Sequence, residues 1–406
     1  MDDEAEGDLA GTTVTIFGAF VDEDAERFEA SMVPFEERTG IDVVYEGSGD
    51  FETQIGIRVD GGDPPDIAAF PQPGLARTFV EDGAVIDVET FLDRAYLEQQ
   101  YNDVWLNLAE IEDIQAGVWY RANIKSLVWY PVPEFEEAGY EIPETWDDLI
   151  ALSDQMVADG NTPWCIGMES SGATGWVATD WMEDILLRTA PPETYDAWVN
   201  HEIPFNAPEI QRAGEIMAEI WFNEDYVLGG TTAIVTIPFG DAPDPLFEEP
   251  PGCFMHRQAS FIPAFFPEDA VLGEDVNIFY LPPIDEEYGN PVLGAGDMMS
   301  MLVDRPEVRA VMEYMTTGES LRAWAEAGGV VSPHNDFDAS WYPTEVDQQY
   351  GEILQNATTF RFDASDLMPQ QVGQGSFWEE MTEWVNSGDP DNLEEALIDI
   401  EESWPE

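Results

Sequence analysis

Residues 13–47, TVTIFGAFVDEDAERFEASMVPFEERTGIDVVYEG, begin a repeating order of strand and helix that determines the fold class. The short apolar run at Thr13–Phe17 predicts a strand. From residue 24 to residue 38 apolar side chains recur at helical spacing, although Pro34 is unfavourable inside a helix. Gly40 ends that helix, and IDVVYEG predicts a second strand.

The same order continues beyond residue 47. DFETQIGIRVDGG predicts a helix with Asp50 as its N-cap and Gly61 as its stop, PPDIAAF predicts a third strand, and GLARTFVEDG predicts a third helix. Strands that alternate with helices are typical of a parallel sheet covered by helices, so the predicted fold class is α/β. A chain of 406 residues suits two domains better than one.

Later elements follow from the same periodicities. Thr145 and Asp148 have the spacing of a capping box at a helix start. Further helices are predicted near residues 178–189, 207–222, 305–316, 343–356, 375–386 and 391–402. Strands are predicted over residues 163–168, 234–237, 253–262 and 276–281.

The charge of the protein is extreme. Its 85 acidic residues face 14 basic ones, for a net charge of −71, and Lys125 is the single lysine. Because 44% of the residues are hydrophobic, the protein is globular and not an acidic disordered tail. In molar salt the Debye length falls to about 3 Å, so such a surface repels itself little. We expect a halophilic protein with an acidic surface; an acid-habitat, a merely acidic or a supercharged protein are the alternatives.

Several functions are excluded or left without support. The charge argues against nucleic acid and anionic membranes as partners. The H-E-x-x-H motif of metalloproteases, the G-x-S-x-G motif of hydrolases and the P-loop are absent from the sequence. The segment GAGDMM from Gly294 does not match the dinucleotide-binding motif G-x-G-x-x-G, because its last position is Met299. No metal and no cofactor are therefore expected. Cys165 and Cys253 lack zinc-ligand spacing, and either two free thiols or one disulfide fits them.

Tryptophan is abundant, with 14 residues. Aromatic rings complement the apolar face of a sugar, and polar side chains bond its hydroxyl groups. Aromatic, acidic and glycine residues coincide in several loop-like segments, which together favour a carbohydrate site: AFPQPG, CIGMESSGATGWVATDW, IPFGDAPDPLF, LGAGDMM and QGSFWEEM.

These segments, in this order, resemble the family 1 extracellular solute-binding proteins of ABC sugar importers. That is the maltose-binding-protein-like class, and the α-glucoside-binding branch is the most similar. Segments such as PPDIAAFPQPG, PPGCFMHRQASF and AWAEAGGVVSPH carry the resemblance. It implies a two-lobed periplasmic-binding-protein-like fold of type II, with a helix-covered sheet in each lobe and a hinge of two or three crossovers. The expected bounds are 12–121 with 286–331 for the N-lobe, 122–285 with 332–406 for the C-lobe, and 1–11 for a flexible acidic lead-in.

The single lysine gains a role from this resemblance. VWYRANIKSLVWYP resembles the first crossover, so Lys125 is expected near the hinge. We expect it to pair with a buried carboxylate, while surface lysines are dispensable. Chance survival of one lysine is the alternative.

The resemblance also implies the residues that contact the ligand. The N-lobe contributes Phe20, Asp22, Glu23, Phe70 and Gln72, and the second crossover contributes Gly296 and Asp297. In the C-lobe the implied contacts are Glu169, Trp176, Asp180, Trp181, Asp241, Arg361 and Trp378, of which Trp378 stacks on a glucosyl ring.

The predicted function is that of a receptor and not a catalyst. It binds an α-glucoside such as trehalose, maltose, sucrose or a glucosylated polyol, and presents it to the membrane subunits of an ABC permease. We expect a monomer outside the cytoplasm, in the periplasm or lipid-anchored at the cell surface, although no signal peptide is visible. The alternatives are a glycoside-processing enzyme, which needs two opposed carboxylates about 5–9.5 Å apart, and a receptor for another small polar ligand.

Overall fold

The computed structural model describes residues 9–405, which divide into two compact units. Unit 1 is the sequence up to Asn123 together with Ala295–Pro343, and unit 2 is Ile124–Gly294 together with the sequence from Thr344 onward. The backbone therefore passes between the units three times. The lobe bounds expected from the sequence stay a prediction. The expected lead-in at 1–11 lies mostly outside the described residues.

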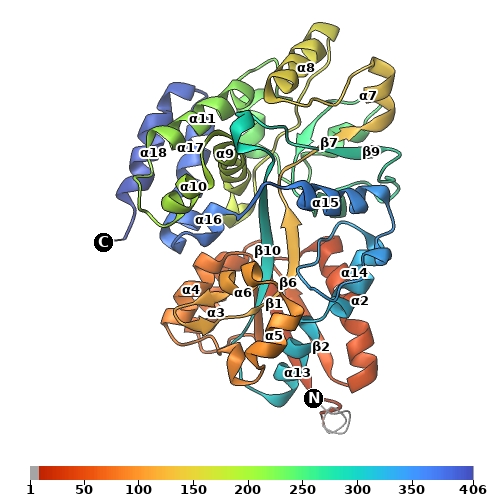
Figure 1. Cartoon of the computed structure of the whole chain (residues 1–406), viewed down its shortest axis with the longest axis vertical. Helices are drawn as coiled ribbons and strands as arrows, with labels where there is room; N and C mark the ends of the chain where they lie inside the picture. Colours follow the sequence, from red (N-terminus) through yellow and green to blue (C-terminus); the bar gives the residue numbers. More distant parts are fainter. Residues whose placement is uncertain (1–8, 406) are drawn as a thin grey trace. The chain divides into compact units, whose positions relative to one another are not determined.

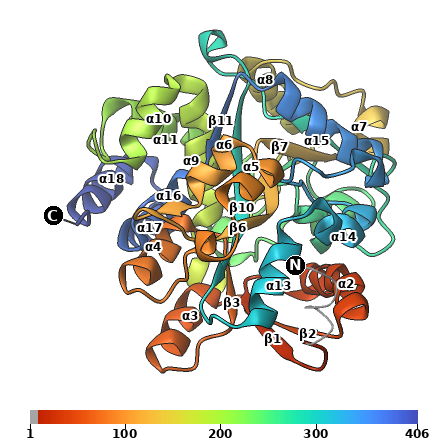
Figure 2. The ribbon, with the colours of Figure 1, turned by 60° about the horizontal axis from the view of Figure 1, so that its bottom comes forward.

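The core of unit 1 is a sheet in which β1 (Thr13–Gly18) lies between β2 (Asp42–Gly47) and β3 (Ile67–Phe70), all parallel. Part of β10 (Pro291–Met301) pairs antiparallel with β3, and β6 (Val118–Ile124) pairs with β10. Figures 1 and 2 show the helices on its two faces, α2 (Asp22–Thr39) on one and α3 (Phe51–Asp60) and α4 (Pro73–Glu81) on the other. The predicted α/β class is confirmed, and so is the strand–helix order of the first third of the sequence.

Shorter elements complete unit 1. They are η1 (Val88–Thr90), α5 (Arg94–Gln100), α6 (Asp103–Leu108), β4 (Glu110–Ile111), β5 (Ile114–Gln115), α13 (Pro306–Met315), η6 (Gly318–Leu321), α14 (Arg322–Ala327) and η7 (Ala339–Trp341).

Unit 2 combines a small antiparallel sheet with a group of long helices. In the sheet, β7 (Leu127–Pro131) lies between β8 (His256–Arg257) and β9 (Val276–Tyr280). Figure 1 shows the long helices packed together. These are α9 (Trp176–Thr189), α11 (Pro208–Trp221), α17 (Trp378–Ser387) and α18 (Leu393–Glu402). Their apolar faces bury Trp181 and Trp221 in the main core of this unit.

The other elements of unit 2 are mostly short. They are α7 (Val132–Ala138), α8 (Trp146–Asp159), η2 (Ser171–Ala173), α10 (Pro192–Val199), α12 (Gly230–Thr236), η3 (Asp244–Phe247), η4 (Ile262–Phe265), η5 (Glu286–Tyr288), α15 (Glu345–Asn356), β11 (Thr359–Phe362), α16 (Ala364–Leu367), the π-helical η8 (Gln371–Phe377) and η9 (Pro390–Asn392). Strand β11 pairs parallel with the first residues of β10.

Helix ends test the local predictions. Thr145 and Asp148 form the predicted capping box at the start of α8. Helix α2 runs through Pro34 and ends where Gly40 adopts a left-handed conformation with φ 71°. Asp50 is the N-cap residue of α3 and Gly61 its C-cap, as predicted, although the Asp50 side chain makes no capping hydrogen bond. The hydroxyl of Ser48 instead accepts a hydrogen bond from the Asp50 N–H at 3.1 Å.

Three of the four predicted strands of unit 2 need correction. Residues 234–237 belong mainly to α12, because its packing against α17 outweighs the strand preference of Thr, Ile and Val. Within 253–262 only His256–Arg257 is strand. Within 163–168 only Trp164 makes strand-like bridges, to Val227 and Met255. The strand predicted over 276–281 is confirmed as β9.

Cys165 and Cys253 form a disulfide, so the alternative of two free thiols is wrong. Both residues are buried. The bridge joins the segment that leads to Glu169 with the segment that leads to β8. Across residues 9–405, each helix is too short or too polar to cross a membrane.

Candidate functional site

Lys125 lies near the start of unit 2, between β6 and β7, and its side chain is buried. Its Nζ donates to Oδ1 of Asp180 at 2.7 Å and to Oδ2 of Asp363 at 2.6 Å. Burial lowers the pKa of Lys125, but the two carboxylates outweigh burial and raise it well above its usual value. The expected pairing of Lys125 with a buried carboxylate is confirmed, and there are two such partners.

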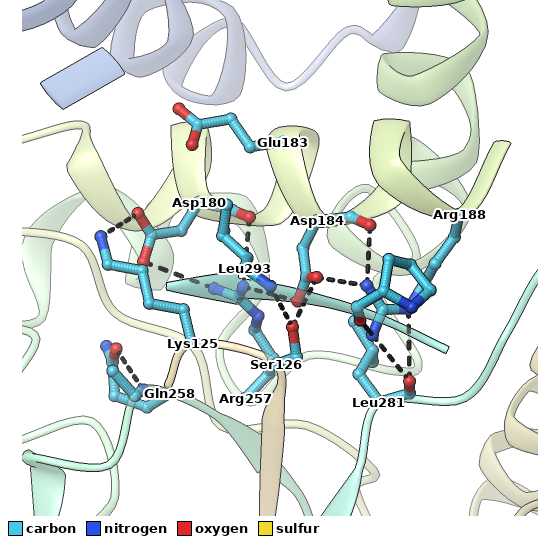
Figure 3. Close-up of polar contacts among 12 residues, drawn as sticks. Lys125, Ser126, Asp180, Glu183, Asp184, Arg188, Arg257, Gln258, Leu281 and Leu293 are labelled. Atoms are coloured by element: carbon cyan, nitrogen blue, oxygen red, sulfur yellow. Dashed lines mark hydrogen bonds and ion pairs between the residues drawn. The ribbon is translucent and has the colours of Figure 1, made fainter. Parts of the chain in front are cut away.

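Helix α9 supplies a row of buried ionisable side chains, Asp180, Glu183, Asp184 and Arg188, which Figure 3 shows along one stretch of the helix. Asp184 accepts hydrogen bonds from Nη2 of Arg257 at 2.8 Å and from Arg188. Arg188 also donates to the backbone oxygen of Leu281. Glu183 accepts hydrogen bonds from the N–H groups of Ala364 and Ser365, so each member of this row meets an opposite charge or a polar backbone group.

The row holds more carboxyl groups than cations, and the surplus determines its protonation. Burial raises the pKa of Asp180 to about 7, although Lys125 lowers it. Burial also raises the pKa of Glu183 well above its usual value, and the nearby Asp363 carboxylate adds to that effect. Burial would raise the pKa of Asp363 as well, but Lys125 reverses the direction and lowers it. Lys125 therefore favours the ionised form of Asp363, whereas burial favours the protonated forms of Asp180 and Glu183.

Four half-buried aromatic rings meet at the N-terminus of α9. They are Trp176, Phe239, Phe261 and Phe265, and we call them the aromatic patch. Ring centroids lie 5.2 Å apart for Trp176 and Phe239 and 5.1 Å apart for Phe239 and Phe265. Lys125 Nζ lies 5.4 Å from the centroid of Trp176. Half-exposed rings that contact one another offer an apolar surface suited to the C–H face of a sugar.

Glu169 lies beside the aromatic patch. Its backbone oxygen accepts a hydrogen bond from the Phe239 N–H at 3.0 Å, so the two residues are fixed next to each other. Its half-buried carboxylate accepts a hydrogen bond from the Ser171 N–H at 2.8 Å through Oε1. Asp241 follows two residues after Phe239 and is exposed. The structure thus brings three predicted residues, Trp176, Glu169 and Asp241, to one loop region of unit 2.

Gly175 allows this region to form. Its φ is +117°, and a Cβ there would lie 2.3 Å from the backbone oxygen of Trp378. Only glycine fits such an approach. The start of α9 therefore packs directly on the start of α17, which places Trp378 beside Trp176 in the fold. The ring of Trp378 itself is buried.

Three other predicted residues of unit 2 serve its interior or its ion pairs. Asp180 is the buried partner of Lys125. Trp181 packs in the core against Trp164 and Trp221. Arg361 forms two hydrogen bonds with Asp196, at 2.6 and 2.8 Å. Their side chains are thus engaged in the core and in ion pairs, and a ligand contact of these three residues stays a prediction.

In unit 1 the predicted residues gather around an arginine that the sequence did not single out. Arg121 donates to Asp297 from Nε and to Asp24 from Nη1, both at 2.7 Å. Its guanidinium carbon lies 4.5 Å from the ring centroid of Phe20 and 4.7 Å from that of Trp324. Phe20 and Asp297 therefore come together, with the predicted Gly296 adjacent in sequence, but all three are buried.

The remaining predicted residues of unit 1 follow the ends of parallel strands, where ligands bind in open α/β sheets. Gln72 follows β3 and donates from Nε2 to Glu52 at 3.1 Å, while its Oε1 is buried without a partner. Asp22 and Glu23 lie at the start of α2, and Glu23 is exposed. Phe70 is fully buried in the core of the unit, so only part of this predicted set reaches solvent.

Sequence reasoning missed Phe239, Phe261, Phe265 and Arg121. Phe239 lies in the quoted segment IPFGDAPDPLF, and Phe261 ends the quoted segment PPGCFMHRQASF. The sequence feature that could have identified them is an aromatic residue beside Gly, Pro or Ser near the end of a predicted short strand. For Arg121 the signal was a lone cation inside the apolar segment VWYRANI. Residues 9–405 contain no group of three or more His, Cys, Asp or Glu side chains placed to hold a metal ion.

Comparison with known proteins gives a consistent result. The family model described as bacterial extracellular solute-binding protein matches residues 11–234. An osmoprotective compounds-binding protein of Synechocystis sp. is 46% identical over 399 residues, which cover 98% of this chain and 94% of the relative. An alpha-glucosides-binding periplasmic protein of Rhizobium meliloti is 43% identical over 391 residues, covering 93% and 84%.

Solved structures share the fold at low sequence identity. The bacterial solute receptor AcbH, described as preferring β-D-galactopyranose, superposes with a TM-score of 0.82 at 18% identity and covers 97% of this chain and 98% of its own. Maltose-bound MalE3 of T. maritima superposes with a TM-score of 0.75 at 13% identity, with coverage of 97% and 98%. These likenesses confirm the predicted maltose-binding-like fold class.

Proposed function

Because the protein belongs to the family of bacterial extracellular solute-binding proteins, whose members are binding receptors and not enzymes, we propose that it captures an α-glucoside for import. It is a solute-binding protein of an ABC sugar importer, and it works with permease subunits in the membrane. The prediction of a receptor and not an enzyme is confirmed. The identity of the ligand is the part that we propose.

The observation that carries the proposal is the aromatic patch beside Glu169. Rings at Trp176, Phe239 and Phe261 remain half-exposed although the same unit buries most of its other aromatic residues. Exposure of aromatic surface to water is unfavourable, and exposed apolar patches often mark the place where a ligand binds. Glu169, whose backbone is bonded to that of Phe239, carries a carboxylate that can accept hydrogen bonds from sugar hydroxyl groups. We propose that a glucosyl ring stacks on this patch.

The two relatives narrow the choice of glycoside. One is named for osmoprotective compounds and the other for alpha-glucosides, and both exceed 40% identity. A glucosylated polyol satisfies both names, and the disaccharides trehalose, maltose and sucrose are further candidates. We propose that residues of both units contact the ligand and that binding shifts the population towards a closed form. A thermal-shift screen across these neutral sugars tests the assignment, because a ligand raises apparent stability by mass action.

Replacing Trp176 by alanine is expected to weaken binding of the best neutral glycoside about 10- to 100-fold, because the sugar loses its stacking partner. Isothermal titration of wild type and variant measures the change. The unfolding midpoint of the variant should fall only modestly, since the half-buried ring packs against the edge of the core of unit 2 and is not enclosed in it.

Trp404→Ala is the matched control. Trp404 is also half-buried in unit 2, but its ring stacks on His201 with 4.2 Å between centroids, near the end of the sequence. We expect its removal to leave the affinity unchanged. Equal affinities for wild type and Trp176→Ala would rule out the aromatic patch as the sugar platform. A screen in which only other small polar molecules bind would favour a different ligand class.

The proposed receptor function also suggests where the protein acts and in which oligomeric state. The family is extracellular or periplasmic, and the disulfide agrees with an oxidising compartment. We propose that a lipid anchor or the periplasm keeps the protein near its permease. We also propose that it acts as a monomer, as one receptor molecule presenting one ligand.

The net charge of −71 leads us to propose that the protein works in brine. Raising salt from about 0.1 M to 1 M shortens the Debye length from about 10 Å to about 3 Å, which removes most surface repulsion. The melting temperature is therefore expected to rise by about 10 °C or more over this range. Thermal unfolding at several salt concentrations measures this rise. A melting temperature that does not change with salt would refute the halophilic proposal.

A further inference from the structure

The cations of this protein are already engaged with its own groups. Lys125 and twelve of the arginines form ion pairs with an Asp or Glu. Arg38 is engaged as well, and it lies over the rings of Phe35 and Tyr314, at 5.6 and 5.5 Å from their centroids. The positive charge of the paired residues is therefore already opposed by carboxylates of the protein itself, which lowers what an incoming anion gains by approaching them.

The cation nearest the aromatic patch is also engaged with carboxylates of the protein. A cation does lie near Trp176, but it is Lys125, whose Nζ is bonded to Asp180 and Asp363 and whose side chain is only 7% exposed. Releasing Lys125 towards a ligand would leave the buried Asp363 without a cation and Asp180 with only the longer contact to Arg257, which is strongly unfavourable. The charged side chains that remain accessible beside the patch are those of Glu169 and Asp241, and both are anions.

From this distribution of charge we infer that the binding site accepts neutral glycosides and rejects those that carry a carboxylate or phosphate, and that Glu169 is a residue that determines this specificity. The inference rests on the proposed function, because it concerns the same site. It adds a chemical rule that fold and relatives do not contain. Glycosides exist in matched neutral and anionic forms, so the rule separates compounds of nearly equal shape.

The physical reason has a long-range and a contact part. An anionic ligand is repelled at long range by the net negative protein, and molar salt screens that repulsion. In contact, the ligand carboxylate loses water beside Glu169 without gaining a cation, and salt does not remove this cost. Discrimination that survives molar salt is therefore the signature of the site itself, as opposed to the overall charge of the protein.

Glucosylglycerol and glucosylglycerate form a suitable pair of probes, because a hydroxymethyl group in one is a carboxylate in the other. Trehalose and its monouronic acid extend the comparison to a disaccharide. Isothermal titration of the full-length protein at low and at molar salt gives the affinities. We expect the affinity for each neutral probe that binds to exceed the affinity for its anionic partner about 100-fold or more at low salt. At molar salt the ratio of the two affinities should still be about 10-fold or more.

The variant Glu169→Gln isolates the contact part. A glutamine keeps an acceptor for the Ser171 N–H, so the loop geometry is retained while the charge is lost. We expect the neutral-to-anionic ratio in molar salt to fall about tenfold, with a smaller change for the neutral probe. The control Glu209→Gln removes one charge from the exposed side of α11 and should leave the ratio as in wild type.

The outcomes separate the two proposals. If no neutral glycoside binds, the proposed function fails and the inference fails with it. If a neutral probe binds and its anionic partner binds equally well in molar salt, the inference alone is overturned. An unchanged ratio in Glu169→Gln, with wild type discriminating, would overturn the role assigned to Glu169.

Discussion

Replacing Lys125 by methionine is expected to lower the free energy of unfolding by about 3–5 kcal/mol, because it leaves a buried charge uncompensated. Asp363 would lose the one ion-pair partner that it has among residues 9–405. Asp180 would keep only the longer contact with Arg257, at 3.5 Å. Denaturant unfolding in molar salt, where wild type is expected to be most stable, measures the loss. Binding should weaken too, since Trp176 begins the helix that carries Asp180.

Two controls define what the lysine contributes. Lys125→Arg keeps the charge but places a larger planar group in a filled space, so we expect a smaller loss than for methionine. Arg77→Met removes an exposed cation whose partner is Glu112, and little change in stability is expected. A methionine variant as stable as wild type would contradict the structural role of Lys125 and would favour chance survival of the residue.

The second large effect is expected from the disulfide. The double variant Cys165→Ser, Cys253→Ser should lose about 4–5 kcal/mol of unfolding free energy according to the chain-entropy estimate, because the bridge closes a long loop. The two cysteines are 88 positions apart. Denaturant unfolding of the variant and of wild type, each with and without reductant, measures this contribution.

Reductant distinguishes the covalent link from the packing of the sulfur atoms. Wild type should lose stability when its bridge is reduced in the unfolded state, whereas the double variant should be indifferent to reductant. The affinity of the variant for a neutral glycoside is informative as well, since Glu169 follows four residues after Cys165. A wild type that behaves identically with and without reductant would show that the bridge adds no stability.

Sequence reasoning succeeded where the signal is local and periodic. Helix α2 and the three parallel strands of unit 1 follow directly from the alternation of apolar residues, and the capping box at Thr145 follows from the spacing of two residues. The expected role of Lys125 followed from its isolation among 85 acidic residues and from the resemblance that placed it near a crossover. The helix, the strands and the capping box are each fixed by neighbours within a few positions.

The prediction was weaker where tertiary contacts decide. Residues 230–236 have the composition of a strand and fold as a helix, since α17 provides a surface for them. Phe20 and Phe70 look like ligand-facing aromatics in the sequence, but the structure buries both. Phe261 and Phe265 of the aromatic patch come from a short 3-10 turn without periodicity. The resemblance to a family predicts the order of the segments, but it does not predict whether each side chain faces the core or the ligand.

The burial of Lys125 has a consequence for handling the protein. Amine-directed dyes, crosslinkers and coupling resins react with accessible ε-amino groups, and the folded protein offers none, because its one lysine is enclosed with Asp180 and Asp363. Attachment to a sensor surface through ε-amino groups would therefore report unfolding. Carboxylates, which the surface holds in abundance, are the natural chemical handle for tethering this receptor in its native state.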